Sequence, residues 1–365
     1  MATSVMHRVY NFGAGPAVLP ESVLEQVKHD LLSLPKVGMS VLEISHRSVA
    51  FNHILEQAEA DLRMLAGVSE SYHVLFLQGG ASLQFAMVPM NLLSQGSVAD
   101  YVLTGAWAKK AAAEAAHFGE VNICATTENE GFIRVPTADE LRPTRGAKYL
   151  HLTSNNTIFG TQWPEIPTVG TAPVVVDVSS DLLCRPVDVS RFGLVYAGAQ
   201  KNIGPAGLTL VIVHKDLVKH GSKSLPMMLS YSVAAEHGSR YNTPPVFSIY
   251  VCGLVLKWLR EIGGLAEMEA RNRRKATLLY NAIDRTEFYR GTAQTESRSL
   301  MNATFRLPTE ELEHRFIDQA TVEGLSGLGG HRSVGGLRAS IYNAFPEVGV
   351  AALVEFMAEF ERTQG

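Results

Sequence analysis

Short apolar runs that alternate with segments of helical periodicity constrain the fold of this chain more than any other feature. Runs rich in Val, Ile, Leu and aromatic residues are typical of buried strands, whereas apolar residues spaced three and four apart are typical of helices. Their alternation predicts an α/β fold with a mostly parallel sheet and helices on both faces. In open sheets of this kind, ligands bind at the carboxyl ends of the strands. The predicted strands are residues 73–77, 98–103, 120–124, 148–153, 173–177, 194–196 and 208–213.

One lysine stands in a loop of small residues between the last two predicted strands. The segment 197–207 reads Ala-Gly-Ala-Gln-Lys-Asn-Ile-Gly-Pro-Ala-Gly, with Lys201 near its centre. Burial or nearby positive charge would lower the pKa of this amine and free it as a nucleophile. A lysine in such a place is more often a solvated turn residue, so its meaning depends on the neighbouring motifs.

A carboxylate ends the strand predicted at 173–177, one connection and one strand before the lysine. Asp177 would therefore point into the crevice at the carboxyl edge of the sheet. A strand-end aspartate followed by a loop lysine is the pair that a pyridoxal phosphate (PLP) enzyme requires. The lysine, Lys201, would form the Schiff base, and the aspartate would keep the ring nitrogen protonated. The alternative for Asp177 is a helix N-cap or a turn residue.

Other polar and aromatic residues also follow predicted strands. Residues 78–82 form a glycine turn between a strand and a helix, where free backbone N–H groups can hold a phosphate. Trp107 follows the next strand and either lies flat on an aromatic cofactor or belongs to the core. Thr157 ends a run of four hydrogen-bonding residues, 154–157. Their convergence predicts a single active site at the carboxyl edge of the sheet.

Two charged motifs outside the predicted sheet are candidates for binding anions. Residues 329–338 carry His331, Arg332 and Arg338 among glycines, which is typical of an anion-binding loop, although a surface turn could have the same composition. Arg47 could be a plain surface charge or a planar fork for a carboxylate. Spacing does not decide between these roles.

A glycine pair at 263–264 marks the expected start of a smaller C-terminal unit. The predicted organisation is an N-terminal arm over residues 1–15, a large domain over 16–262 and a small α+β domain over 263–365. The helix predicted after the glycine pair is expected to turn four basic residues to solvent: Arg271, Arg273, Arg274 and Lys275.

Composition argues against several classes of protein. Lys and Arg number 32 against 36 Asp and Glu, a net charge of −4 that disfavours general nucleic-acid binding. The three cysteines lie far apart and lack the spacing of a zinc site or a disulfide framework, so no metal is expected. No segment has the length and apolarity of a membrane span or a signal peptide, and a cytoplasmic protein is expected.

Taken in order, these motifs resemble the phosphoserine aminotransferase family, a group of fold-type I, class V PLP aminotransferases. The resemblance runs nearly from end to end of the chain. It implies a large PLP-binding domain, a small C-terminal domain and a homodimer with shared active sites. The matching segments are residues 11–16, 45–47, 79–82, 89–93, 104–107, 200–207, 242–245, 331–332 and 339–344.

The resemblance implies a role for each candidate residue. Lys201 would carry the cofactor and move a proton at the substrate, and Asp177 would hold the ring nitrogen. Trp107 would stack on the ring, and Thr157 would contact the ring hydroxyl. The remaining assignments are Ala81, Ser82 and Gln200 for the cofactor phosphate, Asn242 and Thr243 for the same phosphate from the neighbouring subunit, Arg47 with His46 for the substrate α-carboxylate, and His331, Arg332 and Arg338 for the second anionic group.

The reaction implied is reversible amino transfer between L-glutamate and 3-phosphohydroxypyruvate, giving O-phospho-L-serine and 2-oxoglutarate. Whether 4-phosphohydroxythreonine is a second substrate is left open. So is the effect of two departures from other members, Ala14 in place of serine and Ala81–Ser82 in place of an arginine-bearing turn. The rival hypotheses are another class V enzyme, such as a cysteine desulfurase or an alanine–glyoxylate aminotransferase, and a non-catalytic nucleotide-binding or scaffold protein.

Overall fold

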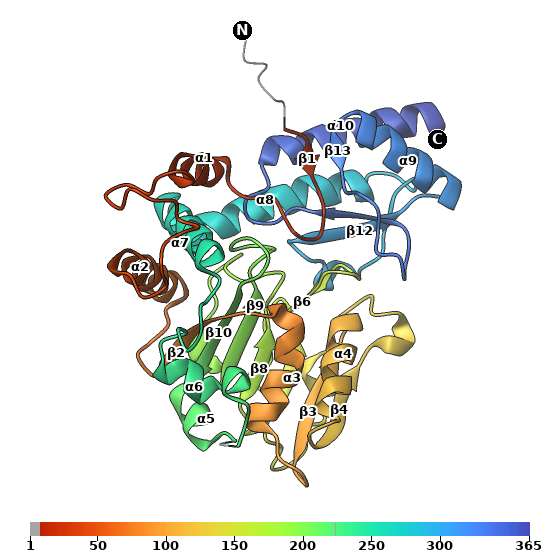
Figure 1. Cartoon of the computed structure of the whole chain (residues 1–365). Helices are drawn as coiled ribbons and strands as arrows, with labels where there is room; N and C mark the ends of the chain where they lie inside the picture. Colours follow the sequence, from red (N-terminus) through yellow and green to blue (C-terminus); the bar gives the residue numbers. More distant parts are fainter. Residues whose placement is uncertain (1–7, 223) are drawn as a thin grey trace.

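A seven-stranded sheet forms the centre of the computed structural model, which describes residues 8–222 and 224–365 (Figure 1). Its strands are β2 (Tyr72–Leu77), β3 (Val98–Leu103), β4 (Glu120–Thr126), β5 (Leu150–Thr153), β8 (Val174–Asp177), β9 (Leu194–Gly198) and β10 (Thr209–His214). Their spatial order is β2-β10-β9-β8-β5-β3-β4. All neighbours are parallel except β10, which runs antiparallel to both β2 and β9. The predicted, mostly parallel α/β fold is confirmed.

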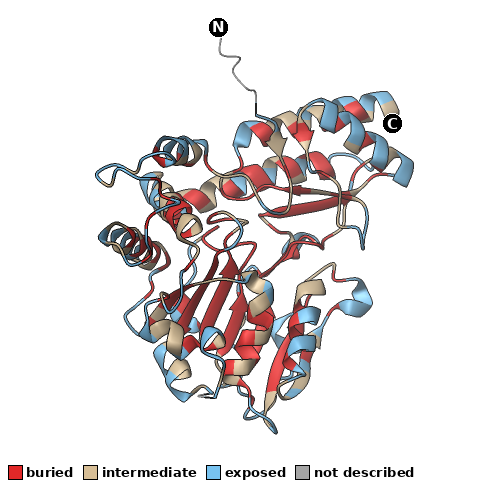
Figure 2. Ribbon diagram, in the orientation of Figure 1, coloured by how far each residue is buried: buried red, intermediate tan, exposed pale blue. Residues whose placement is uncertain are grey.

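Helices cover both faces of the sheet, which explains the continuous apolar runs in its strands (Figure 2). Every residue of β8 and β9 is buried, as expected for strands with helices on both sides. Among the described residues, no helix is long and apolar enough to cross a membrane. One face carries α1 (Glu21–Asp30), α2 (Val49–Ala66) and α7 (Val246–Glu261), and the other carries α3 (Gly80–Leu92), α4 (Ala106–Ala115), α5 (Lys215–His220) and α6 (Tyr231–Glu236).

The loop that carries Lys201 joins two antiparallel neighbours. Because β10 runs back beside β9, the chain turns sharply at the carboxyl end of β9 instead of crossing over to a parallel strand. A backbone hydrogen bond from Ala199 N to Leu208 O, at 2.9 Å, closes the loop at its base. The buried Ile203 anchors the loop in the first hydrophobic core, which lies between the sheet and α1, α2 and α7. These contacts fix the position of Lys201 at the edge of the sheet.

A second hydrophobic core lies against a small antiparallel sheet (Figure 1). Phe12, from the N-terminal segment, is fully buried in this core. α8 joins the two cores, because Leu265 near its start packs in the first and Leu279 in the second. The domain boundaries stay a prediction. The elements here are β11 (Arg290–Gly291), β12 (Asn302–Arg306), β14 (Leu337–Ser340), α8 (Gly264–Asp284), α9 (Glu310–Val322) and α10 (Glu347–Gln364), with β1 (Tyr10–Asn11) paired to β13 (Leu325–Ser326).

One basic residue of α8 is buried, so the prediction of a solvated basic face is wrong for Lys275. Its side chain is only 1% exposed. Its Nζ donates hydrogen bonds to the carbonyl oxygens of Ile341 (2.9 Å), Tyr342 (2.6 Å) and Phe345 (3.2 Å). These three carbonyls lie in the loop between β14 and α10 and match the three N–H donors of an ammonium group.

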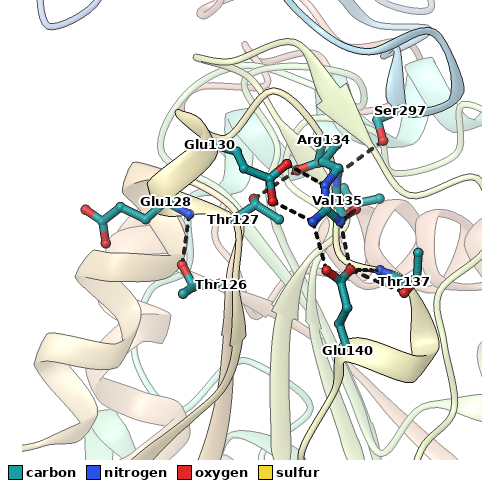
Figure 3. A network of polar contacts seen from close by, with 9 residues as sticks. All are labelled: Thr126, Thr127, Glu128, Glu130, Arg134, Val135, Thr137, Glu140 and Ser297. Atoms are coloured by element: carbon teal, nitrogen blue, oxygen red, sulfur yellow. Dashed lines mark hydrogen bonds and ion pairs between the residues drawn. The ribbon is translucent and has the colours of Figure 1, made fainter.

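A polar network ties the connection between β4 and β5 to the second core (Figure 3). Arg134 pairs with Glu130 and Glu140, and Val135 N donates to Ser297 Oγ at 3.1 Å. The charged groups are partly solvated, so the ion pairs contribute little, and the buried bond to Ser297 is the firmer link. The remaining short elements are β6 (Asn155–Asn156), β7 (Thr161–Gln162), η1 (Glu128–Glu130), η2 (Ala138–Glu140), η3 (Val189–Arg191), η4 (Met227–Leu229) and η5 (Thr295–Ser297).

Candidate active site

The residues predicted at the strand ends line one pocket at the carboxyl edge of the sheet. Asp177 ends β8, and the Lys201 loop follows the adjacent β9. Trp107 lies in the first turn of α4, and Thr157 lies in the turn between β6 and β7. The lining residues are Gly80, Ala81, Ser82, Phe85, Trp107, Thr153, Asn155, Thr157, Asp177, Ser179, Ser180, Gln200 and Lys201.

The Lys201 amine faces this pocket and has an unusual acidity. Its Nζ donates to Thr157 Oγ1 at 2.9 Å. Burial, opposed by the charge of Asp177 and assisted by that of Arg338, lowers the pKa of Lys201 to about 8. The N-terminal segment lies against the same loop, since Ala17 N donates to Gln200 O at 2.8 Å. The pocket thus presents an amine that can lose its proton near neutral pH.

Asp177 is the buried carboxylate of the pocket. Its side chain is 4% exposed, and its Oδ1 accepts a hydrogen bond from Ser179 N at 2.9 Å. Burial raises the pKa of Asp177, and hydrogen bonds from Ser179 and Tyr196 and the charge of Lys201 partly offset that rise. A lysine and an aspartate whose pKa values are shifted toward each other are characteristic of functional sites.

The beginning of α3 forms an anion cradle on the pocket wall. Gly79 is the N-cap in a left-handed conformation (φ 91°), and no side chain caps the helix there. A Cβ at Gly79 would lie 2.4 Å from Leu83 Cδ2, so the tight turn requires glycine. The first N–H groups of the helix therefore remain free next to Ala81 and Ser82, which suits a phosphate. An uncapped helix end, a buried carboxylate and a deprotonatable amine together fit PLP.

Positive charges gather next to this pocket. Arg338, on β14, donates from Nη1 to Thr157 O at 3.4 Å, and its buried Nε has no hydrogen-bond partner among the described residues. His331 and Arg332 lie in the turn before β14. The charges of Arg338, Arg332 and Lys110 add to burial in lowering the pKa of His331.

Lys110 was not among the residues predicted from the sequence to belong to the site. Its Nζ lies over the ring of Trp107, 4.7 Å from the ring centroid. Its position one helical turn after Trp107 was the available signal, because side chains at this spacing share a helix face. Lys110 is exposed and forms no ion pair with any described carboxylate.

Besides the three cations next to the pocket, four more predicted residues do not line it within one chain. His46 and Arg47 precede α2, where His46 is buried with an unpartnered Nε2 and Arg47 is exposed. Asn242 lines a neighbouring apolar pocket, and Thr243 O accepts from Gln78 Nε2 at 2.9 Å. The contribution of Asn242 and Thr243 from a neighbouring subunit stays a prediction.

Comparison with known proteins agrees with this geometry. A family model described as aminotransferase class-V matches residues 9–353. A phosphoserine aminotransferase from Desulfosudis oleivorans is 55% identical over 360 residues, which cover 98% of this chain and 99% of that protein. The chain belongs to the phosphoserine aminotransferase family of class V. The resemblance inferred from the motifs is confirmed.

Solved structures of this family share the fold closely. The phosphoserine aminotransferase from Bacillus circulans subsp. alkalophilus superimposes with a TM-score of 0.96 at 50% identity, covering 98% of this chain and 99% of that one. The PLP-bound phosphoserine aminotransferase from Trichomonas vaginalis superimposes with a TM-score of 0.92 at 37% identity, covering 96% of this chain and 100% of that one. The family fold therefore extends over nearly the whole chain.

Proposed function

We propose that this enzyme is a phosphoserine aminotransferase that uses PLP to transfer an amino group reversibly between L-glutamate and 3-phosphohydroxypyruvate. The products are 2-oxoglutarate and O-phospho-L-serine. The observation that carries the proposal is the pocket itself, in which Lys201 and Asp177 lie between an uncapped helix end and a group of cations. Bound PLP would supply an electron sink for the substrate carbon that loses its proton.

Lys201 is the group that holds the cofactor and moves the proton. A pKa of about 8 leaves roughly a tenth of the amines uncharged at pH 7, against about one in 3,000 for an ordinary lysine. The uncharged Nζ is the nucleophile for the cofactor aldehyde and the base for the substrate Cα. Thr157 orients Nζ through the hydrogen bond to its Oγ1.

The other lining residues would hold the cofactor in place. Asp177 would pair with the ring nitrogen and keep it cationic, and Trp107 would cover one face of the ring. Ala81, Ser82 and Gln200 would bind the phosphate at the start of α3. Each of these groups belongs to a strand end or a helix start, so the fold preorganises the pocket.

The structure supports a different division of labour among the arginines from the one the resemblance implied. Arg338 contacts Thr157 and acts on Lys201, so it lies beside the carbon at which the proton moves. We therefore assign the α-carboxylate to Arg338, whose unpartnered Nε is available. His331 and Arg332, on the turn before β14, suit the distal phosphate. Arg47 stays a predicted substrate residue.

Lys110 is expected to select for a dianionic distal group. Lys110→Met should raise KM for 3-phosphohydroxypyruvate by about three- to tenfold and KM for glutamate less, because a dianion loses more from one missing cation. Lys109→Met is the matched control, since the neighbouring Lys109 is committed to an ion pair with Glu128. Steady-state kinetics at low and at high salt would measure both. Equal, small effects of the two substitutions would refute the role.

The three buried cysteines argue against a cysteine desulfurase. Burial raises the pKa of Cys124, Cys184 and Cys252, to about 12 for Cys252. A buried, protonated thiol is a poor nucleophile, whereas a desulfurase needs a reactive thiolate.

A comparison of amino acceptors tests the proposed function. With glutamate as donor, kcat/KM for 3-phosphohydroxypyruvate should exceed that for pyruvate by about a hundredfold or more, because charged hydrogen bonds to the phosphate are lost with pyruvate. Equal efficiencies would favour an aminotransferase for uncharged substrates instead. A colourless protein that takes up no PLP would favour the non-catalytic alternative.

The assembly and location are part of the proposal. A homodimer would bring Asn242 and Thr243 of one subunit to the cofactor phosphate of the other, since neither lines the pocket of its own chain. A cytoplasmic enzyme accords with the free cysteines.

A further inference from the structure

A buried histidine beneath the proposed cofactor site has no role in the function described so far. His151, on β5, is 1% exposed, and its Nδ1 has no hydrogen-bond partner in the described part of the chain. Its Nε2 lies 2.9 Å from the hydroxyl oxygen of Tyr196. Its ring stacks on Tyr101, with centroids 4.8 Å apart and planes at 22°. A polar ring held this firmly, yet half-satisfied, calls for an explanation.

Tyr196 connects this histidine to Asp177. Tyr196 on β9 and Asp177 on β8 are register partners in a parallel pair, so their side chains share one face of the sheet. The Tyr196 hydroxyl lies next to the Asp177 carboxylate and, after Ser179 and Lys201, helps to lower its pKa. On β5, His151 is two residues before Thr153, the register partner of Asp177, and therefore lies on the same face. The three side chains form a chain across three neighbouring strands.

The direction of the hydrogen bonds in this chain follows from chemistry. Burial lowers the pKa of His151 to about 3, so the imidazole is neutral and carries one N–H. An ionised Asp177 only accepts, so the single proton of Tyr196 goes to Asp177. The Tyr196 oxygen then accepts from His151 Nε2–H. This leaves Nδ1 as a bare lone pair, and an unpaired acceptor is less costly to bury than an unpaired N–H.

We propose that Tyr196 and His151 are positioning residues that hold Asp177 ionised and oriented toward the cofactor ring nitrogen. The inference rests on the proposed function. Burial alone favours the protonated carboxyl, which could not pair with a cationic ring nitrogen. A phenol whose oxygen already accepts a hydrogen bond is a stronger donor, because hydrogen bonds in a chain polarise one another.

The remaining groups around Asp177 do not replace the hydrogen-bond relay from His151 through Tyr196 to Asp177. Ser179 donates its backbone N–H to the carboxylate, and the Ser179 hydroxyl and the Lys201 ammonium also favour its ionised form. Lys201 can give up that charge when its amine reacts, and the nearby buried Asp181 opposes ionisation of Asp177. Tyr101 and Tyr149 bond to each other and not to the carboxylate. The Tyr196 hydroxyl is thus the donor that connects the carboxylate to His151.

The test measures PLP affinity of the apoprotein, by fluorescence titration, across pH 6 to 8.5. Tyr196→Phe should weaken PLP binding about tenfold or more, and the ratio to wild type should grow as pH falls, because a carboxylate that lacks its donor takes up a proton more readily. His151→Phe keeps the stacking and should weaken binding about two- to fivefold in the same direction. Tyr149→Phe, which removes another buried hydroxyl of this layer, should leave the affinity within twofold of wild type.

The outcomes separate the relay from its alternatives. Equal losses in Tyr196→Phe and Tyr149→Phe, or a ratio that does not change with pH, would show a merely structural role and overturn the relay. If Tyr196→Phe does not fold, as thermal unfolding of the apoprotein would reveal, His151→Phe decides by the same criterion. A wild-type protein that takes up no PLP at any pH would overturn the proposed function, and the relay with it.

Discussion

Lys201→Ala should abolish amino transfer, with kcat lowered by at least about 10⁴-fold. The loss follows from the proposed double role of this amine, which would hold the cofactor and move the proton at the substrate carbon, and no other described lysine lines the pocket. The variant should also lack a covalent lysine–cofactor bond, so its absorption spectrum should resemble that of free PLP. Stopped-flow absorbance and steady-state kinetics would measure both effects.

Two controls make this prediction specific. Lys109→Ala removes an exposed lysine that pairs with Glu128 outside the pocket, and it should keep full activity. Added primary amines should partly restore the proton transfer in Lys201→Ala, since the pocket would have room for a small base. Turnover at the wild-type rate in Lys201→Ala would contradict the assignment.

Asp177→Asn should lower kcat by about a hundredfold or more while leaving the apoprotein at least as stable as the wild type. Activity falls because a neutral amide cannot hold the ring nitrogen cationic. Stability does not fall because burial raises the pKa of Asp177 in the folded state. A carboxyl whose pKa is raised by folding stabilises the folded state at low pH, and this stabilisation is lost as the pH rises through the pKa of the folded state. At neutral pH the buried carboxylate therefore lowers the free energy of unfolding, and asparagine removes that penalty.

Asp181→Asn is the matched control for this effect. Asp181 is also buried after β8, but it accepts hydrogen bonds from Ser154 and Gln162 and lies outside the pocket lining. Its replacement should leave both PLP affinity and kcat largely intact. Loss of stability without loss of activity in Asp177→Asn would reverse the expected pattern and contradict the role of the carboxylate.

Much of the site could be predicted because its residues follow strands. Asp177 and Lys201 lie after apolar runs that the sequence pattern identifies as buried strands, and parallel strands bring their carboxyl ends to one edge. The glycine turn before α3 could also be predicted, because a short sequence motif determines both the left-handed Gly79 and the free N–H groups after it.

The residues that escaped prediction act through contacts across the fold. Tyr196 and His151 sit within apolar runs and look like core residues until the register of three strands places them on one face with Asp177. Lys275 has the sequence context of a surface lysine, and only the packing of α8 on the loop after β14 shows the three carbonyls that bind it. Spacing carries no information on such partners.

The separate roles of the candidate arginines also could not be predicted from the sequence. Sequence motifs identified Arg47, Arg332 and Arg338 as anion-binding candidates but could not rank them. The strand position of Arg338 and its contact with Thr157 place it next to the Lys201 pocket, which favours its proposed role with the α-carboxylate. Arg47 lies outside the pocket lining of its own chain and stays a predicted substrate residue.

Borohydride reduction followed by peptide mapping tests the central claim most directly. Reduction of the purified holoenzyme should fix PLP permanently to one residue, and mass spectrometry should locate the adduct on the peptide that carries Lys201. The account predicts a single modified site at this lysine, close to one equivalent per chain, and no adduct in Lys201→Ala. An adduct on another lysine, or a protein that binds PLP without any reducible bond, would contradict it.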